Sequence, residues 1–286
     1  MAGFKTYKEL VDAEDAGQVN YSTWRKTPTQ ITTIGIWFDL SMSPGNPIPQ
    51  YYAAAPGVAV ALAQSTDYGL RHGGTVTPKT KHLRNITGLS VSGTGLPMPM
   101  MLLDYLMFYP FIDEGSTDEQ TLATNIALPR YPTGAGVQMM AVSVAGRTGG
   151  ASFSVKYVNQ DGTQDRVSQT VVQNAVSVNG SIVTSDRAVA LARGPFIPLQ
   201  AGDTGVRRVQ SVTMATADVG LFALVLVKPL ADFRLQDVTA PVEVDYLKDF
   251  STAPVIADDA YLNWICNPAA SLSGIALHGD IKTVWN

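Results

Sequence analysis

The chain has 286 residues, of which 45% are apolar and only 15% are charged, and its net charge is −4. Soluble domains usually carry about 25% charged residues, so much of this surface is expected to be neutral or buried against other chains. The charge balance lacks the excess of basic residues that is typical of proteins that bind nucleic acid. No apolar run is long enough to cross a membrane as a helix. We therefore expect neither nucleic acid nor a membrane as a partner.

The cysteine content and the number of turn-forming residues restrict the class of protein further. Cys266 is the one cysteine, which excludes an intrachain disulfide framework and a cysteine-based zinc cluster. We expect it to be a small buried apolar residue. The first residues lack the apolar stretch of a signal peptide, so a soluble protein made in a host cytoplasm is expected. The 25 glycines and 17 prolines favour many turns over long helices.

The N-terminal part alternates between short ordered segments and loops. Residues 5–15 predict a short helix, and residues 31–40 predict a strand that is rich in β-branched and aromatic side chains. Residues 41–52 contain three prolines and must form a loop that lies on the surface or is held by a partner. Residues 67–81 predict an exposed loop.

The most apolar window of the chain is 97–112. Within it, residues 100–109 can be interpreted as a helix or as a long strand that carries several aromatic side chains. The helix would have Leu102, Tyr105, Leu106 and Tyr109 on one side. We favour helix or mixed structure here. Asp104 is the sole charge in the window, and we expect it to be a hydrogen-bonded carboxylate in the core.

The rest of the chain predicts mostly strands. Residues 137–145 alternate as a half-buried strand, and residues 153–172 predict a hairpin around the turn 159–162. Residues 206–213 predict a strand with a bulge or a half-buried edge strand, whereas the apolar run 221–227 predicts a central strand that is covered on both faces. Shorter strand candidates are residues 188–191, 240–245 and 261–265. From residue 137 on, turn signals recur about every 8 to 14 residues, which is typical of a sandwich or jelly roll.

These elements predict an all-β fold. We expect a jelly-roll-like β-sandwich with long irregular N-terminal and C-terminal extensions and a few short helices. Residues 1–48 would form an N-terminal arm with extended loops, and residues 49–235 the main sandwich domain. Residues 236–286 would be a C-terminal extension that packs on the same domain.

The sequence contains no motif typical of a catalytic, cofactor or metal site. His72, His82 and His278 lie at unrelated spacings, without a metal-binding pair. The acidic segment 113–119 does not have the spacing of an EF-hand loop, and a solvated loop is the better interpretation. The glycine clusters lack the pattern of a phosphate-binding loop. We therefore expect no enzyme activity, no cofactor and no metal ion.

Several stretches resemble a family of virion structural proteins of tailed bacteriophages. The stretches are WFDLSMSPGNP at 37–47 with Tyr51 and Tyr52, LDYL and YPFID within 103–113, LPRYPTGAGV at 128–137, KYVNQDG at 156–162 and PLQAGDTGVR at 198–207. The resemblance implies a part of the virion shell or neck, and best fits a jelly-roll-like protein on the capsid exterior. It assigns no functional residue.

Together, the resemblance and the low charge predict a capsid decoration or cement protein. Its expected partners are the major capsid protein and copies of itself in a homo-oligomer such as a trimer. Trp37, Tyr51, Tyr52 and Trp285 are the candidate contact residues, since uncovered aromatic side chains are typical of interfaces. One alternative is a neck, collar or tail component. Another is a jelly-roll glycan-binding module or hydrolase, for which the loop 113–119 and Tyr109 are the only hints.

Overall fold

The protein folds into antiparallel sheets in a sandwich-like arrangement, with only a few short helices. The computed structural model describes residues 4–185, 194–246, 248 and 253–286. The predicted mostly-β class is confirmed. In this described part, the helices are α1 (Tyr7–Asp15), α2 (Gln64–Asp67) and a 3-10 turn (Leu40–Met42), and none is long and apolar enough to span a bilayer. Helix α1 confirms the helix predicted over 5–15, although it begins two residues later, at Tyr7.

The first sheet contains strands from both ends of the chain. Its order is β14 (Val242–Asp245), β5 (Lys81–Ser90), β17 (Leu277–Trp285), β1 (Val19–Lys26) and β3 (Gly45–Asn46), with β15 (Val255–Ile256) also paired to β5. Strand β17 thus lies between β1 and β5. Helix α1 packs on this sheet through Leu10 and Ala13, which contact Val284.

The middle and third sheets complete the sandwich. The middle sheet has the order β2 (Phe38–Asp39), β16 (Leu262–Cys266), β6 (Met98–Asp113), β13 (Leu221–Leu235) and β8 (Gln138–Ala145), with β4 (Val60–Ala61) paired to β6. The third sheet has the order β10 (Arg166–Val167), β9 (Ser152–Asn159), β12 (Val206–Met214) and β7 (Gln120–Thr121), with β11 (Val171–Val172) paired to β9.

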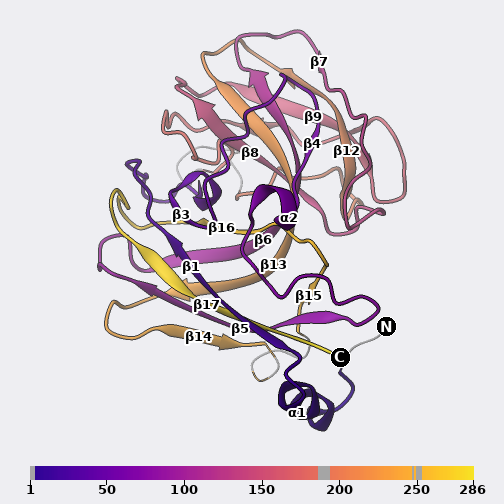
Figure 1. Ribbon diagram of the computed structural model, residues 1–286. Coiled ribbons are helices and arrows are strands. Elements are labelled where there is room, and N and C mark those ends of the chain that lie inside the picture. Colours follow the sequence, from indigo (N-terminus) through magenta and orange to yellow (C-terminus); the bar gives the residue numbers. More distant parts are fainter. Residues whose placement is uncertain (1–3, 186–193, 247, 249–252) are drawn as a thin grey trace.

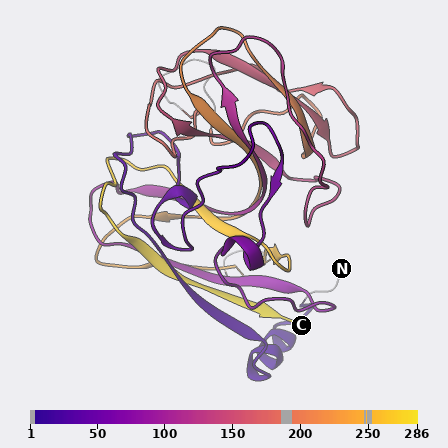
Figure 2. The same cartoon turned by 45° about the horizontal axis from the view of Figure 1, so that its top comes forward.

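The long strands β6 and β13 belong to both halves of the molecule. Figure 1 shows the third sheet at the top, the first sheet near the bottom, and β6 and β13 between them; Figure 2 shows the same order. The first part of β6 pairs with β16, and its side chains pack against the first sheet in a core that includes Trp24 and Trp264. The second part packs against β9 and β12 in a core that includes Phe153 and Phe222. One strand pair therefore serves two cores.

The strand assignment of residues 98–113 corrects the sequence interpretation. The favoured helix or mixed structure over 100–109 is wrong, because β6 runs unbroken through the window. Its side chains are buried on both faces, so the alternation of a half-exposed strand is missing from the sequence. Leu102 packs toward the first sheet, whereas Leu103 and Tyr105 pack into a separate cluster on the other face.

Strand β13 extends further than predicted. The central strand expected over 221–227 is confirmed, but pairing with β6 continues past Pro229 to Leu235. The register shifts on either side of Pro229, between Leu226 and Val227 and between Pro229 and Ala231. Such bulges bend a strand pair, and here they lie where one core gives way to the other.

The midpoint of β6 is held by a buried ion pair. Asp104 is fully buried, and the Arg130 guanidinium donates to its two oxygens from Nε at 3.0 Å and Nη2 at 2.8 Å. Arg130 also donates to the carbonyl oxygens of Leu62 and Tyr105, while the backbone N–H of Tyr261 donates to Asp104. Burial raises the pKa of Asp104, and the charge of Arg130 opposes that rise. The expected hydrogen-bonded core carboxylate is confirmed.

Most of the other sequence predictions are confirmed, with two corrections. The hairpin around 159–162 forms from β9 and β10, and β12 carries the expected bulges. The strand predicted over 31–40 is wrong except at β2. The loop predicted over 67–81 is exposed in part, but Leu70 and His72 are buried. The strand candidate 188–191 lies outside the described residues.

We predict that Arg130→Ala lowers the free energy of unfolding by about 3–5 kcal/mol, because it leaves the Asp104 carboxylate buried without its partner. The matched control is Lys156→Ala, whose ammonium lies 2.6 Å from Glu119 in a partly exposed pair. Its loss should be below about 1 kcal/mol. Urea unfolding monitored by tryptophan fluorescence measures both. Equally small losses of unfolding free energy in both variants would show that the buried pair between Arg130 and Asp104 does not stabilise β6.

Candidate contact surface and groove

A segment of irregular chain between β1 and the body of the middle sheet exposes large apolar side chains. We call residues 27–52 the contact segment. Its side chains Ile31, Ile34, Ile48 and Tyr51 are exposed by 67%, 59%, 49% and 58%, respectively. Single exposed apolar side chains are common on protein surfaces, but several within one short segment can form part of a surface that binds another macromolecule.

A buried polar cluster anchors this segment to the middle sheet. The Asp39 carboxylate has no exposed surface and accepts hydrogen bonds from the backbone N–H and hydroxyl of Ser41 and from the hydroxyls of Tyr52 and Tyr105. Tyr105 lies on β6, so the anchor reaches the central strand. Burial raises the pKa of Asp39, and these four hydrogen bonds oppose the rise. A buried carboxylate with four donors fixes the path of the chain around it.

Lys26 provides a second anchor at the end of β1. Its ammonium is fully buried and donates to the carbonyl oxygens of Ser43 at 3.1 Å and Pro47 at 2.6 Å. Burial lowers the pKa of Lys26 to about 7, and the charge of Asp39 acts in the opposite direction. The contact segment therefore has buried attachments on both sides of its proline-rich part.

The four predicted contact residues lie in different environments. Tyr51 is exposed and borders a cavity of about 140 Å³ beside Phe38. Trp37 is half-buried and packs against the cluster on the outer face of the middle sheet. Tyr52 has no exposed surface, so the expectation that it is uncovered is wrong; its hydroxyl is needed by Asp39. Trp285 is half-buried near the end of β17, far along the chain from the other three.

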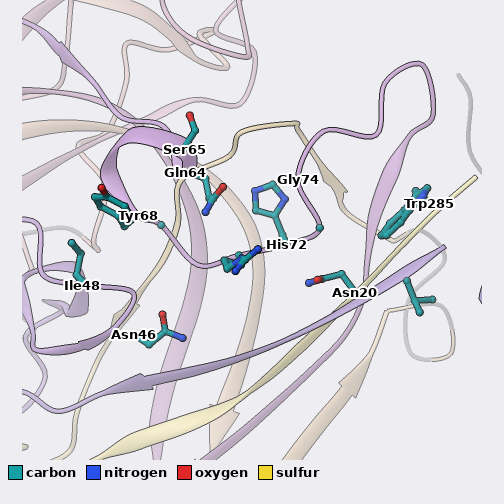
Figure 3. A pocket seen from close by; sticks show the side chains of 13 residues that line it. Asn20, Asn46, Ile48, Gln64, Ser65, Tyr68, His72, Gly74 and Trp285 are labelled. Atoms are coloured by element: carbon teal, nitrogen blue, oxygen red, sulfur yellow. The ribbon is translucent and has the colours of Figure 1, made fainter. Parts of the chain in front are cut away.

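Trp285 lines a groove on the described structure. The groove has a volume of about 750 Å³ and is bordered by the beginning of β1, by β3, by α2 with the chain that follows it, and by the end of β17. Figure 3 shows Tyr68 and Ile48 at one end and Trp285 at the other, with Gln64, His72 and Asn20 between them. No sequence motif marks this site, because its residues come from four separate segments.

The floor of the groove contains a histidine whose ring nitrogens are both engaged. His72 Nε2 lies 3.0 Å from the carbonyl oxygen of Ala260, and Nδ1 lies 3.0 Å from the ammonium of Lys81. These contacts require Nε2 to donate and Nδ1 to accept. Burial, together with the charge of Lys81, lowers the pKa of His72 to about 4. His72 is thus a neutral structural residue near pH 7.

The other chemical candidates of the sequence do not converge. Tyr109 is buried and its hydroxyl bonds to Thr124, so it is not available to a ligand. In the loop 113–119, Glu114 is buried and paired with Arg147 at 3.0 Å, which corrects the expectation of a wholly solvated loop. Across the described ranges, no group of three metal-binding side chains occurs. Cys266 is buried as expected, and burial raises the pKa of its thiol.

Comparison with known proteins yields only weak similarity. No protein-family model matches the chain, and no curated protein is similar to it. Among solved structures, the VP2 subviral particle of infectious bursal disease virus matches with a TM-score of 0.17 and 10% identity, over 94% of this chain and 81% of that chain. The structure of the Gt strain of the same virus matches with a TM-score of 0.17 and 11% identity, over 94% and 81% of the two chains. The chain is thus weakly similar to a viral particle protein, without a family assignment.

We predict that the free energy of unfolding rises between pH 7 and pH 9 through Lys26. Its pKa is lower in the folded protein than in the unfolded chain, so the unfolded state binds more protons in this range and stability increases with pH. Lys26→Met should remove this part of the slope, whereas Lys8→Met, on the exposed side of α1, should keep it. Urea titrations at several pH values measure the slopes. An unchanged slope in Lys26→Met would contradict the assignment.

Proposed function

We propose that this chain is a non-enzymatic structural protein of a bacteriophage virion. Its role would be that of a decoration or cement protein on the capsid exterior, where it bridges and stabilises capsid subunits. The observation that carries the proposal is the exposure of four large apolar side chains in the contact segment, Ile31, Ile34, Ile48 and Tyr51. Buried hydrogen bonds of Asp39 and Lys26 anchor the same segment to the sheets.

The physical argument is preorganisation. Binding through a loop normally requires that the loop become ordered, which costs free energy. Here the buried hydrogen bonds of Asp39 and of Lys26 fix residues 39–52 before any partner arrives. Near Ile31 and Ile34, the hydroxyl of Thr32 donates to the carbonyl oxygen of Ala270 and accepts from the backbone N–H of Leu272. The apolar side chains can therefore contribute to association at a low entropic cost. Repetition over a shell multiplies a modest contact through avidity.

The composition supports the same function. With a net charge of −4 over 286 residues, the chain has little long-range electrostatic repulsion between neighbouring copies. The expected partners are the major capsid protein and other copies of this chain in a homo-oligomer such as a trimer. The sequence resemblance to tailed-bacteriophage virion proteins points to the same setting. None of these arguments requires a catalytic group, a cofactor or a metal ion.

We predict that the double variant Ile31→Ser with Ile34→Ser binds particles lacking this protein at least about tenfold more weakly than the unmodified chain, because interface side chains of this kind carry a large part of the binding free energy. The matched control is Val219→Ser, at a position that is 64% exposed in the connection between β12 and β13. Co-sedimentation with purified particles over a range of protein concentrations measures the affinity.

The number of copies per particle decides between the shell and the neck or tail. A decoration protein should be present in hundreds of copies, and a neck, collar or tail component in tens around an axis. Quantitative mass spectrometry of purified particles gives this number. A copy number near zero, or equal binding by the double variant and the unmodified chain, would overturn the proposal.

A further inference from the structure

The groove that ends on Trp285 has the size and shape of a ligand site. Its volume of about 750 Å³ lies within the range typical of small-molecule pockets. Its walls come from the first sheet and from the chain around α2. Gly73 allows the close approach of these two parts, since a Cβ there would lie 3.1 Å from both the Trp285 ring and the Asn20 side chain.

The polar groups around the groove retain unused hydrogen-bonding capacity. Among the described residues, the side chains of Gln64, Tyr68 and Arg71 make no hydrogen bond or ion pair. Asn20 and Asn46 each donate from Nδ2, to Ser22 and to the carbonyl oxygen of Thr23, which leaves their amide oxygens as acceptors. Side-chain amides combine donors and acceptors in one plane, which matches the adjacent hydroxyls of a sugar.

Two aromatic rings lie at the ends of this polar stretch. Tyr68 is 64% exposed and Trp285 is half-buried, and Figure 3 shows them at opposite ends of the groove. Tyr68 is the C-cap of α2 and has a φ of 59°, the left-handed conformation in which helices often end. Aromatic rings offer flat apolar faces on which the C–H faces of sugar rings stack.

The charges at the groove exclude several other ligands. Arg71 is the one Lys or Arg among the described residues that line the groove, and none of those residues is an Asp or a Glu. A cationic ligand would therefore find no partner, and a phosphate would find a single guanidinium instead of the several donors that phosphate sites provide. His72 is neutral and fully hydrogen-bonded, so no acid–base pair for hydrolysis is present in the groove.

From this combination we propose that the groove binds a short oligosaccharide without cleaving it. Sugar rings stack on Tyr68 and Trp285, and their hydroxyls bond to Gln64 and to the amide oxygens of Asn20 and Asn46. Arg71 contacts a hydroxyl or, in a uronic acid, the carboxylate. This site is distinct from Ile31 and Ile34, so binding of saccharide and attachment to a particle can be tested separately.

The test uses the full chain and four defined probes: maltotriose, cellotriose, chitotriose and trigalacturonate. Saturation-transfer NMR detects binding, and the change in tryptophan fluorescence with concentration gives the affinity. At least one probe should bind with a dissociation constant of about 1 mM or below. Gln64→Ala and Tyr68→Ala should each weaken it at least about tenfold. The control is Tyr7→Ala, which removes another exposed tyrosine, on α1 and outside the groove.

Each outcome bears on the proposal. Preference for trigalacturonate that disappears in Arg71→Ala supports binding through the guanidinium, and preference for a neutral probe supports binding through the amides. Tyr68→Ala should still bind particles, which separates failure of the groove from failure of the virion function. The absence of binding by all four probes at about 10 mM, or binding that Gln64→Ala and Tyr68→Ala both leave unchanged, overturns the proposal.

Discussion

The pairing of β6 with β13 is the constraint on which the rest of the structure depends. These two strands contribute to a core on the first sheet and to a second core on the third sheet, so neither core is complete without them. At the junction, the strand pair bends at bulges around Pro229, and Arg130 reaches in to bond the Asp104 carboxylate. Because a buried carboxylate is costly without a partner, this contact also fixes where the chain around Arg130 crosses the sheet.

Buried charges lie at several places where irregular chain meets a sheet. Asp104 holds the segment around Arg130, Asp39 and Lys26 hold the contact segment, and Glu114 pairs with Arg147 beside the loop 113–119. Long loops gain little from secondary structure, so their conformation must come from side-chain hydrogen bonds. In a chain with few charges, several of them are thus used to fix loops in the interior. The surface features that support the proposed function depend on this arrangement.

Strand content and turns could be predicted from the sequence, whereas long-range placement could not. The apolar run at 221–227, the hairpin turn at 159–162 and the helix at the start carry local signals, and the structure confirms them. The window 97–112 does not predict its strand, because a strand that is buried on both faces lacks the alternation of apolar and polar residues. Local pattern also cannot show that β17 inserts between β1 and β5, or that Lys26 meets Ser43 and Pro47.

The same limit applies to the candidate sites. Tyr51 could be identified as an exposed aromatic in a proline-rich loop, but its neighbour Tyr52 points into the core, and only the position of Asp39 explains why. The groove joins residues as distant as Asn20 and Trp285, so no motif marks it. The proline-rich composition of residues 41–52 predicts a surface loop, but only the structure shows which of its side chains are exposed.

Hydrogen–deuterium exchange of the intact chain, followed peptide by peptide, tests the central claim most directly. If β6 and β13 unite two cores, their amides should exchange only through global unfolding, and peptides from the first and third sheets should become exposed in one cooperative transition as urea is raised. If instead the third sheet and its core exchange at a lower denaturant concentration while β5, β17 and β1 stay protected, the two halves are independent and the account of a shared strand pair is wrong.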